Sequence, residues 1–270
     1  MAAVKIGILG AAGRMGLALV RQIAVTEGAA LAGGVDLAGH PALGQDLGTL
    51  AGLGPQGAAL TADAEALARA ADVLLDFTLP RSVVGHAELA ARLGKPIVVG
   101  TTGTNAEEDA RIRRAAAKTA LLRAANMSVG VNLLLALARQ TAAALNADFD
   151  IEIVEMHHRH KVDAPSGTAL ARGRAAAAGR NAEHDKLAVR GRDGITGERM
   201  RGVIGYAALR GGNVAGEHSV IFAADHERVE LTHRATDRSI FARGAVTAAL
   251  WLPGKPAGFY TMAEVLGFSA

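Results

Sequence analysis

The sequence predicts an α/β protein with a doubly wound parallel sheet, joined to an α+β part with an open mixed or antiparallel sheet. Three observations support this prediction. Short apolar runs alternate with helical patterns up to about residue 127, a glycine-rich turn follows the first run, and strand patterns cluster between residues 203 and 233. The 270 residues suffice for two domains. We place them at residues 1–127 and 128–238, with residues 239–270 returning to the first domain as helices.

The first element is the apolar run Val4–Leu9, which is typical of a buried strand. Gly10-Ala11-Ala12-Gly13-Arg14-Met15-Gly16 follows, and Leu17–Val25 continues at helical spacing. Glycines permit a tight turn and let the backbone approach a pyrophosphate at the helix N-terminus. The glycine spacing is GxxGxxG and not the GxGxxG of the dinucleotide-binding fingerprint. A glycine-rich turn of another α/β protein is therefore the alternative interpretation. Asp36 ends a second strand, Ala30–Val35, about 20 residues beyond the last glycine, and favours a Rossmann-type dinucleotide site.

Asp36 and its neighbour predict the choice of cofactor. A carboxylate at this position accepts hydrogen bonds from ribose hydroxyls and repels a 2′-phosphate. Leu37 offers no cation for that phosphate. NADH is therefore expected to be preferred, although Arg14 can reach a 2′-phosphate and keeps NADPH open as a second cofactor.

The rest of the first domain repeats the strand and helix alternation. Residues 37–57 are irregular and glycine-rich. The expected strands are Asp72–Phe77, Pro96–Val99 and Ala120–Ala124, and the expected helices are Ala62–Ala71, Ser82–Leu93 and Ala106–Lys118. Ligands of such sheets bind at the carboxyl ends of the strands. The small residues that follow those ends suit a nicotinamide ribose, with ordinary turn chemistry as the alternative for each threonine.

The stretch Ile151–Leu170 carries the most chemistry. It begins as a strand, continues into the cationic run His157–Lys161, and reaches a helix start at Ser166–Thr168. Imidazoles, a guanidinium and an ammonium beside free helix amides predict a site for a small, multiply charged anion, with groups that transfer protons. A solvated loop is one alternative. A zinc site on His158 and His160 is another, disfavoured by the neighbouring cations and the absence of cysteine.

The second domain shows a different pattern. Val131–Leu145 reads as a helix, and residues 171–201 are interpreted as a solvated, mobile loop, with attraction of an anionic substrate as the alternative. Three strands, Val203–Arg210, Glu217–Ala224 and Arg228–His233, predict an antiparallel meander. Its apolar face invites a second subunit. Helices are expected at 238–251, with Asp237 as a cap, and near Ala263.

The amino-acid composition excludes several classes of protein. Cysteine is absent, which excludes disulfides and thiol catalysis. The net charge of +3 is mild, and aromatic residues for base stacking are scarce, so no nucleic-acid partner is expected. No apolar run approaches the ~20 residues of a membrane span, and no signal-peptide pattern is present. We therefore expect a soluble cytoplasmic protein without a membrane partner.

Several motifs together resemble the 4-hydroxy-tetrahydrodipicolinate reductase (dihydrodipicolinate reductase) family, and the resemblance runs nearly end to end. The motifs are Gly10–Gly16, Asp76-Phe77-Thr78, Gly100–Gly103, Asn126–Asn132, Glu155–Thr168, Gly216-Glu217-His218, Thr232-His233 and Phe241-Ala242. The His-His-Arg-His-Lys block with Pro-Ser-Gly-Thr is the most specific. The sequence departs from the family pattern at Leu37 and Leu79, where basic residues are common.

The resemblance implies NAD(P)H-dependent reduction of a cyclic imine dicarboxylate in the diaminopimelate and lysine pathway, by a homotetramer. It implies that His157 is a proton donor and acceptor, Lys161 a proton donor, and His158 a substrate ligand. No metal is expected, because of the cations that disfavour zinc. The Gly167 and Thr168 backbone would hold a carboxylate. The implied cofactor ligands are Gly10, Ala11, Ala12, Gly13, Arg14, Met15, Asp36, Gly100, Thr101, Thr102, Ala124, Ala125, Asn126 and Met127. The alternatives are another NAD-dependent imine or semialdehyde reductase, and a non-catalytic NAD-binding sensor.

Overall fold

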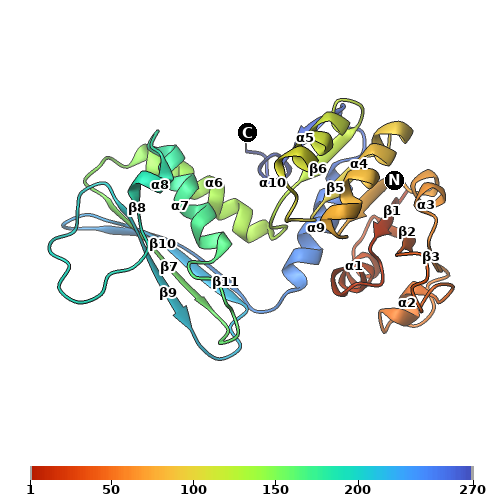
Figure 1. Cartoon of the computed structure of the whole chain (residues 1–270), viewed down its shortest axis with the longest axis horizontal. Helices are drawn as coiled ribbons and strands as arrows, with labels where there is room; N and C mark the ends of the chain where they lie inside the picture. Colours follow the sequence, from red (N-terminus) through yellow and green to blue (C-terminus); the bar gives the residue numbers. More distant parts are fainter. Residues whose placement is uncertain (1, 269–270) are drawn as a thin grey trace. The chain divides into compact units, whose positions relative to one another are not determined.

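A computed structural model describes residues 2–268, and the chain divides into two compact units (Figure 1). One unit contains Met1–Val129 together with Ser239–Ala270, and the other is Gly130–Arg238. The chain thus leaves the first unit once and returns to it once. None of the described helices is long and apolar enough to span a membrane.

The first unit contains a seven-stranded sheet in which every neighbouring pair is parallel, in the order β12-β6-β5-β4-β1-β2-β3. Its strands are β1 (Val4–Leu9), β2 (Ala29–Val35), β3 (Leu60–Thr61), β4 (Val73–Asp76), β5 (Ile97–Val99), β6 (Ala120–Arg123) and β12 (Gly258–Tyr260). The order extends in both directions from β1, so the predicted doubly wound parallel sheet is confirmed.

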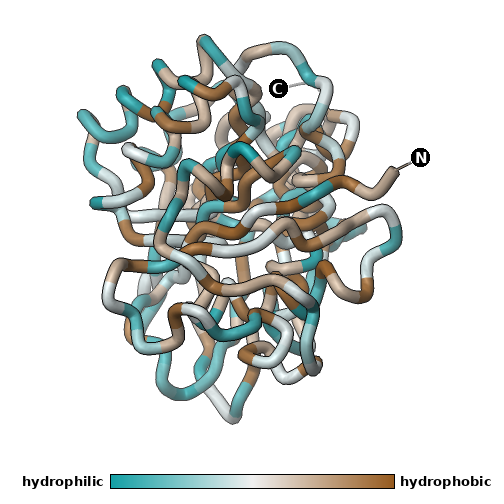
Figure 2. Tube along the Cα trace, turned by 90° about the vertical axis from the view of Figure 1, so that its right-hand side faces the viewer, coloured by the Kyte–Doolittle hydropathy of each residue, from teal (hydrophilic) through white to brown (hydrophobic). Residues whose placement is uncertain are grey.

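Helices cover both faces of this sheet, because alternate strand residues point to opposite sides. Val73 and Leu75 pack into one core, whereas Leu74 packs into the other. The first core is covered by α1 (Arg14–Ala24), α2 (Leu47–Leu50), α9 (Ser239–Trp251) and α10 (Met262–Val265). The second is covered by α3 (Ala64–Ala70), α4 (Pro80–Leu93) and α5 (Ala106–Ala115). In Figure 2, which faces this unit, hydrophobic strand segments lie inside and hydrophilic positions gather on the outer turns.

Three short elements of this unit differ from the sequence prediction. The connection at residues 37–57 contains α2, a single turn capped by Asp46, whose Oδ1 accepts from the Thr49 amide at 2.9 Å. The strands β3 and β12 have two and three residues and extend the sheet at its two edges. Elements this short show no hydrophobic periodicity, so the sequence pattern does not predict them. The helix α1 begins at Arg14 rather than Leu17, because Gly13 is its N-cap residue.

The second unit contains a five-stranded mixed sheet in the order β11-β10-β7-β9-β8. Its strands are β7 (Asp150–His157), β8 (Ala188–Val189), β9 (Ile204–Arg210), β10 (Gly216–Ala223) and β11 (Arg228–Ala235). The predicted antiparallel meander is wrong for β9, which pairs in parallel with β7, while β7 lies between β9 and β10. The reason is the crossover through α7 (Gly167–Gly179) and α8 (His184–Leu187), which carries the chain back to the end of the sheet where β7 begins. The strand β9 therefore runs in the same direction as β7. Only β10 and β11 form an antiparallel hairpin.

The predicted loop at residues 171–201 is also wrong over much of its length. The segment contains most of α7 (Gly167–Gly179), all of α8 (His184–Leu187) and β8. The alanines of α7 favour a helix and pack closely on the sheet, beside α6 (Val129–Ala144). Residues 190–202 are irregular, but Arg199 forms ion pairs with Asp150 and Glu152 and donates to the Val203 carbonyl at 2.7 Å. The positive charge of this segment is thus partly neutralised by Asp150 and Glu152 of β7.

Candidate active site

The loops at the carboxyl edge of the parallel sheet adjoin one another through backbone hydrogen bonds. In each case the first residue after a strand donates to the neighbouring strand. The pairs are Asp36 N to Thr61 O, Gly10 N to Val35 O, Phe77 N to Leu9 O, Gly100 N to Asp76 O, and Ala124 N to Val99 O, at 2.9–3.2 Å. A ligand that lies along this edge can therefore contact the loops after β2, β1, β4, β5 and β6 in turn.

The glycines after β1 are required by close contacts. Gly10 has φ +83°, and a Cβ there would lie 3.0 Å from the Phe77 carbonyl oxygen. A Cβ on Gly16 would lie 2.3 Å from the Gly10 carbonyl oxygen, inside contact distance. Gly13 caps α1 without a side chain, so the first amides of the helix stay uncovered by a side-chain acceptor. These features fit a phosphate-binding turn.

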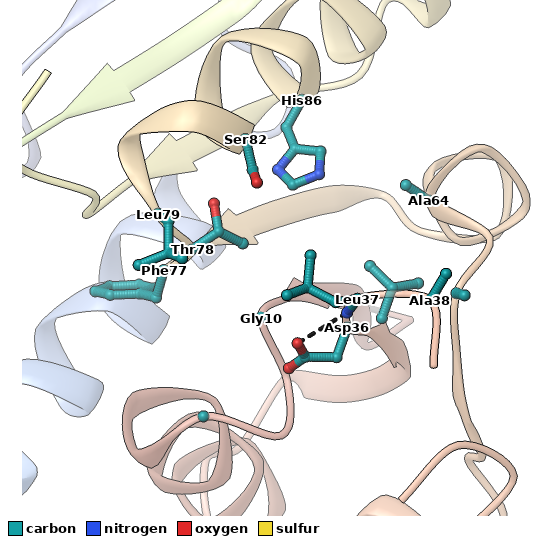
Figure 3. A pocket seen from close by; sticks show the side chains of 13 residues that line it. Gly10, Asp36, Leu37, Ala38, Ala64, Phe77, Thr78, Leu79, Ser82 and His86 are labelled. Atoms are coloured by element: carbon teal, nitrogen blue, oxygen red, sulfur yellow. Dashed lines mark hydrogen bonds between the residues drawn. The ribbon is translucent and has the colours of Figure 1, made fainter. Parts of the chain in front are cut away.

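Asp36 stands at the wall of a pocket of about 390 Å³ (Figure 3). Its Oδ2 accepts from the Ala12 amide at 3.0 Å, and its Oδ1 accepts from the Leu37 amide at 2.9 Å. Leu37, which is 55% exposed, also lines this pocket, whereas Arg14 does not. Among the described residues, the lining includes no arginine or lysine. No arginine or lysine of this described lining therefore offsets the charge of the Asp36 carboxylate.

Across the pocket lies a polar network that sequence reasoning missed. His86 of α4 faces Asp36 and Leu37, and its Nδ1 lies 2.7 Å from Oδ2 of the fully buried Asp76. The hydroxyls of Thr78 and Thr101 donate to the other oxygen of Asp76, at 2.7 and 2.9 Å. The side chain of Thr101 therefore holds Asp76 in place and points away from solvent.

The other residues expected to bind cofactor have mixed positions. Gly100–Thr102 and Ala124–Met127 directly follow β5 and β6 but do not line this pocket. Ala11 and Met127 are buried, and Met15 packs against the core, so these side chains support the loops. Asn126 Oδ1 accepts from the Ser128 amide at 2.9 Å and shapes the turn after β6. Contacts from these loops to a cofactor are consequently expected from the backbone.

In the second unit, His157 ends β7 and is held by Glu155. The His157 Nδ1 lies 2.5 Å from Glu155 Oε2. Because a carboxylate only accepts, Nδ1 carries the proton and Nε2 is the free nitrogen. A Cβ on Gly216 would lie 3.0 Å from that Nε2, so a glycine at 216 keeps the nitrogen uncrowded. This arrangement lets His157 take up or release a proton at Nε2.

Glu155 is itself an almost fully buried carboxylate, 1% exposed, at the centre of the cluster. It accepts two hydrogen bonds from the Arg210 guanidinium, each 2.9 Å, and one from the Ser166 amide at 3.1 Å. Burial raises the pKa of Glu155, but the hydrogen bonds from Arg210 and His157 outweigh burial and lower the pKa overall. Glu155 therefore stays ionised and fixes the orientation of His157.

Ser166 joins this cluster to the start of α7. Its Oγ accepts from the Ala169 amide at 3.1 Å as an N-cap, and it lies 3.0 Å from His218 Nε2. The His218 ring stands edge-on to His157, with ring centres 5.0 Å apart. Burial, together with the charges of Arg172 and His157, lowers the pKa of His218 to about 2. His218 is therefore neutral throughout the physiological range.

The remaining predicted site residues lie on the loop after β7 and at the start of α7. Lys161 Nζ contacts Asp163 Oδ1 at 2.7 Å. Desolvation, followed by the charges of Arg238 and His160, lowers the pKa of His158. Gly167 and Thr168 are the first two residues of α7, at the end of the helix where the helix dipole is positive. The predicted anion site is thus built from one loop and one helix start.

Sequence reasoning missed Glu155, Arg210, Arg238 and His218 as members of this cluster. The period-two pattern of Ile151–His157 places Glu155 and His157 on one face, and this signal was present in the sequence. The register of β9 and β10 against β7, which brings in Arg210 and His218, depends on tertiary pairing. Within residues 2–268, no group of three His, Cys, Asp or Glu side chains is placed to hold a metal ion.

Two family models match this chain. The family model described as "Dihydrodipicolinate reductase, N-terminus" matches residues 4–127, and the one described as "Dihydrodipicolinate reductase, C-terminus" matches residues 130–266. The chain belongs to the dihydrodipicolinate reductase family. It is therefore related to oxidoreductases along its whole length, as the resemblance of the motifs predicted.

Individual relatives agree with the family models. A 4-hydroxy-tetrahydrodipicolinate reductase from Parvibaculum lavamentivorans is 56% identical over 265 residues, which cover 98% of both chains. One from Afipia carboxidovorans is 51% identical and covers 100% of this chain and 99% of its own. The solved dipicolinate-bound dihydrodipicolinate reductase from Paenisporosarcina sp. TG-14 has a TM-score of 0.77 and 24% identity, covering 97% of this chain and 98% of that chain. At that identity the solved structure supports the fold alone.

Proposed function

We propose that this chain catalyses the NAD(P)H-dependent reduction of 4-hydroxy-tetrahydrodipicolinate, a step of diaminopimelate and lysine biosynthesis. The observation that carries the proposal is the Glu155-oriented His157 in one cluster with Ser166, the N-cap residue of α7. That site offers a proton-transfer group and an anion-binding helix end within one unit. The substrate is a cyclic imine with two carboxylates, and relatives at 51–56% identity are named for it.

The proposed chemistry assigns one role to each group. Loss of the 4-hydroxyl group as water leaves a conjugated imine, and a bound nicotinamide would supply a hydride to its electron-poor carbon. Negative charge then develops on the conjugated imine, and Lys161 and His157 provide and exchange the proton that neutralises it. His158, together with the Gly167 and Thr168 amides, binds the carboxylates and thereby fixes the ring for attack. A positioned acid of this kind contributes roughly 10²–10⁴-fold to the rate.

We propose NADH as the preferred cofactor of this chain. The support is Asp36 on the wall of a pocket whose described lining contains no arginine or lysine. Ribose hydroxyls can donate to the Asp36 carboxylate, whereas a 2′-phosphate meets its negative charge. The turn Gly10–Gly16 would hold the pyrophosphate, and the loops after β5 and β6 would contact the nicotinamide half of the cofactor.

The two units also suggest an organisation for the protein. We propose that Met1–Val129 with Ser239–Ala270 binds the cofactor, and that Gly130–Arg238 binds substrate and forms subunit contacts. The expected assembly is a homotetramer through the second sheet, in the cytoplasm. The support is the exposed side chain of Leu209, which lies in register with Met156 on the face of the sheet opposite the helix-covered core.

A steady-state assay tests the proposed function. Purified protein is mixed with freshly made condensation product of aspartate semialdehyde and pyruvate, and the nicotinamide absorbance is followed with NADH or NADPH. Rapid oxidation, faster with NADH, is expected. Equal oxidation with an imine that carries a single carboxylate would indicate a broader imine or semialdehyde reductase. Binding of NADH without turnover of any imine would indicate a sensor.

A further inference from the structure

A fully buried arginine, Arg172, lies on the inner side of α7. The proposed reaction assigns it no role. Arg172 is 0% exposed and shares the buried side of α7 with Ala169 and Ala176. Its Nε, Nη1 and Nη2 have no hydrogen-bond partner among the described residues. Burial lowers the pKa of Arg172 to about 10, so the guanidinium is still charged at neutral pH.

Two histidines of the sheet lie within the electrostatic reach of Arg172. His218 of β10 and His233 of β11 stand directly opposite each other, and the charge of Arg172 lowers the pKa of both. The Nδ1 atoms of both rings are buried and also lack a partner among residues 2–268. If the Ser166 hydroxyl donates to His218 Nε2, the His218 proton is on Nδ1 and that atom is a donor.

The nearest acidic residue in this row of the sheet is already engaged. Glu155 is the cross-strand neighbour of His218, but its oxygens accept from Arg210, His157 and the Ser166 amide. No carboxylate acts on the pKa of Arg172, which burial alone lowers. The guanidinium is thus a buried charge without a counter-charge, an arrangement that proteins avoid because desolvation is not repaid.

We propose that Arg172, His218 and His233 form a binding site for a small anion, a halide or a single carboxylate group. A guanidinium presents five donors and binds planar or spherical anions well, and neutral imidazoles add N–H donors without adding charge. An anion supplies both the missing counter-charge and the missing acceptors. The site is separate from the cofactor pocket. Its occupation by a substrate carboxylate rests on the proposed function, whereas its occupation by a halide does not.

Two sources of the anion share this chemistry. One is an inorganic monoanion such as chloride, bound as a structural ion. The other is a carboxylate of the substrate, because Arg172 follows Thr168 by one helical turn on α7. The site therefore requires a test in which free halide and dicarboxylate are varied separately.

The first experiment measures the thermal midpoint of the purified full chain in sodium methanesulfonate, chloride or bromide at one ionic strength. The wild-type midpoint is expected to rise by several degrees in halide, because a ligand that binds only the folded state stabilises it. Arg172→Met removes the charge and should abolish this rise. Arg174→Met, an exposed arginine of the same helix, is the matched control and should retain it. An equal halide effect in all three proteins would overturn the proposal.

A second measurement uses the wild-type protein alone, so it stands even if Arg172→Met does not fold. Crystals soaked in bromide should show an anomalous peak beside the Arg172 guanidinium. If pyridine-2,6-dicarboxylate leaves that peak in place, the site takes an inorganic anion; if it replaces the peak with a carboxylate, the site takes substrate. The absence of any anion, or a carboxylate from a second protein copy at this position, would contradict the proposal.

Discussion

Glu155 shows how one residue can determine the chemistry of another. The same carboxylate binds a guanidinium, an imidazole and a backbone amide, so none of the three can rotate freely. The interaction with Arg210 keeps Glu155 ionised, and the ionised carboxylate keeps the His157 proton on Nδ1. The proton that moves during catalysis is therefore expected to use Nε2.

Replacement of Glu155 tests this role. Glu155→Gln should lower kcat by roughly 10-fold or more, because outer partners that orient an imidazole typically contribute this much. The KM for NADH should stay nearly constant. Initial rates at saturating substrate would measure the effect. Glu152→Gln is the matched control, since Glu152 lies on the same strand but pairs with Arg192 and Arg199. Equal losses in both variants would reduce Glu155 to a stabilising ion pair.

Lys161 is the proposed proton donor on the loop after β7. Lys161→Ala should lower kcat by roughly 10²–10⁴-fold, the usual contribution of a positioned general acid, with little change in NADH affinity. Stopped-flow and steady-state rates would measure both quantities. Lys186→Ala removes an exposed lysine that is paired with Glu183 and should have wild-type turnover. Wild-type turnover in Lys161→Ala would eliminate the assigned role.

Leu37 should control the choice between NADH and NADPH. Leu37→Arg places a cation at the pocket wall, where a charged hydrogen bond to a 2′-phosphate provides about 1.5–3 kcal/mol. The kcat/KM for NADPH should therefore rise by about one to two orders of magnitude, while the value for NADH changes little. Leu53→Arg, a partly exposed leucine that does not line the pocket, controls for the added charge. An unchanged cofactor ratio in Leu37→Arg would refute the assignment.

At the scale of elements, a neutral histidine connects β10 and α7. His218 of β10 contacts Ser166, the N-cap residue of α7. His218 has an ordinary pKa of 6.5 when unfolded and about 2 in the fold. Between these values the unfolded chain binds one more proton than the folded chain, so stability falls as the pH decreases below 6.5. The loss is about 2 kcal/mol per group at pH 5, at 1.36 kcal/mol per pH unit.

This linkage can be measured by denaturant unfolding between pH 7 and pH 5. His218→Gln cannot take up the proton and should show a smaller decrease in stability over this range than the wild type. His226→Gln changes an exposed histidine in the turn between β10 and β11 and should follow the wild-type curve. Parallel pH curves for His218→Gln and the wild type would show that His218 does not resist protonation in the fold.

The elements themselves differ in how well the sequence predicts them. The parallel sheet was predictable because each buried strand is a continuous apolar run between amphipathic helices. The position of β9 was not, since parallel and antiparallel strands of this length have the same pattern, and the α7 crossover determines the direction. The His157 block and the Asp36 turn were evident from residue types and spacing. Arg172 was not, because a helical sequence does not reveal which side chains lack partners.

At the scale of the whole molecule, the second sheet should determine the oligomeric state. The side chain of Leu209 is 51% exposed and lies in register with Met156, on the face of the sheet opposite the core that contains Phe222. The strand β11 is an edge strand with one neighbour. Such surfaces usually pack against a second copy. Light scattering should therefore detect a homo-oligomer, and Leu209→Asp should shift it toward smaller species. A monomer at micromolar concentration would contradict the proposed tetramer.

The return of the chain at Ser239 has a consequence for biosynthesis. The strand β12 pairs with β6, and α9 contributes Ala242, Ala245 and Val246 to the core formed with β1 and α1. The first unit therefore lacks an edge strand and one core helix until residues 239–260 have left the ribosome. The unit Gly130–Arg238 is contiguous and emerges complete before that point. During translation, the segment synthesised second should reach its native state first.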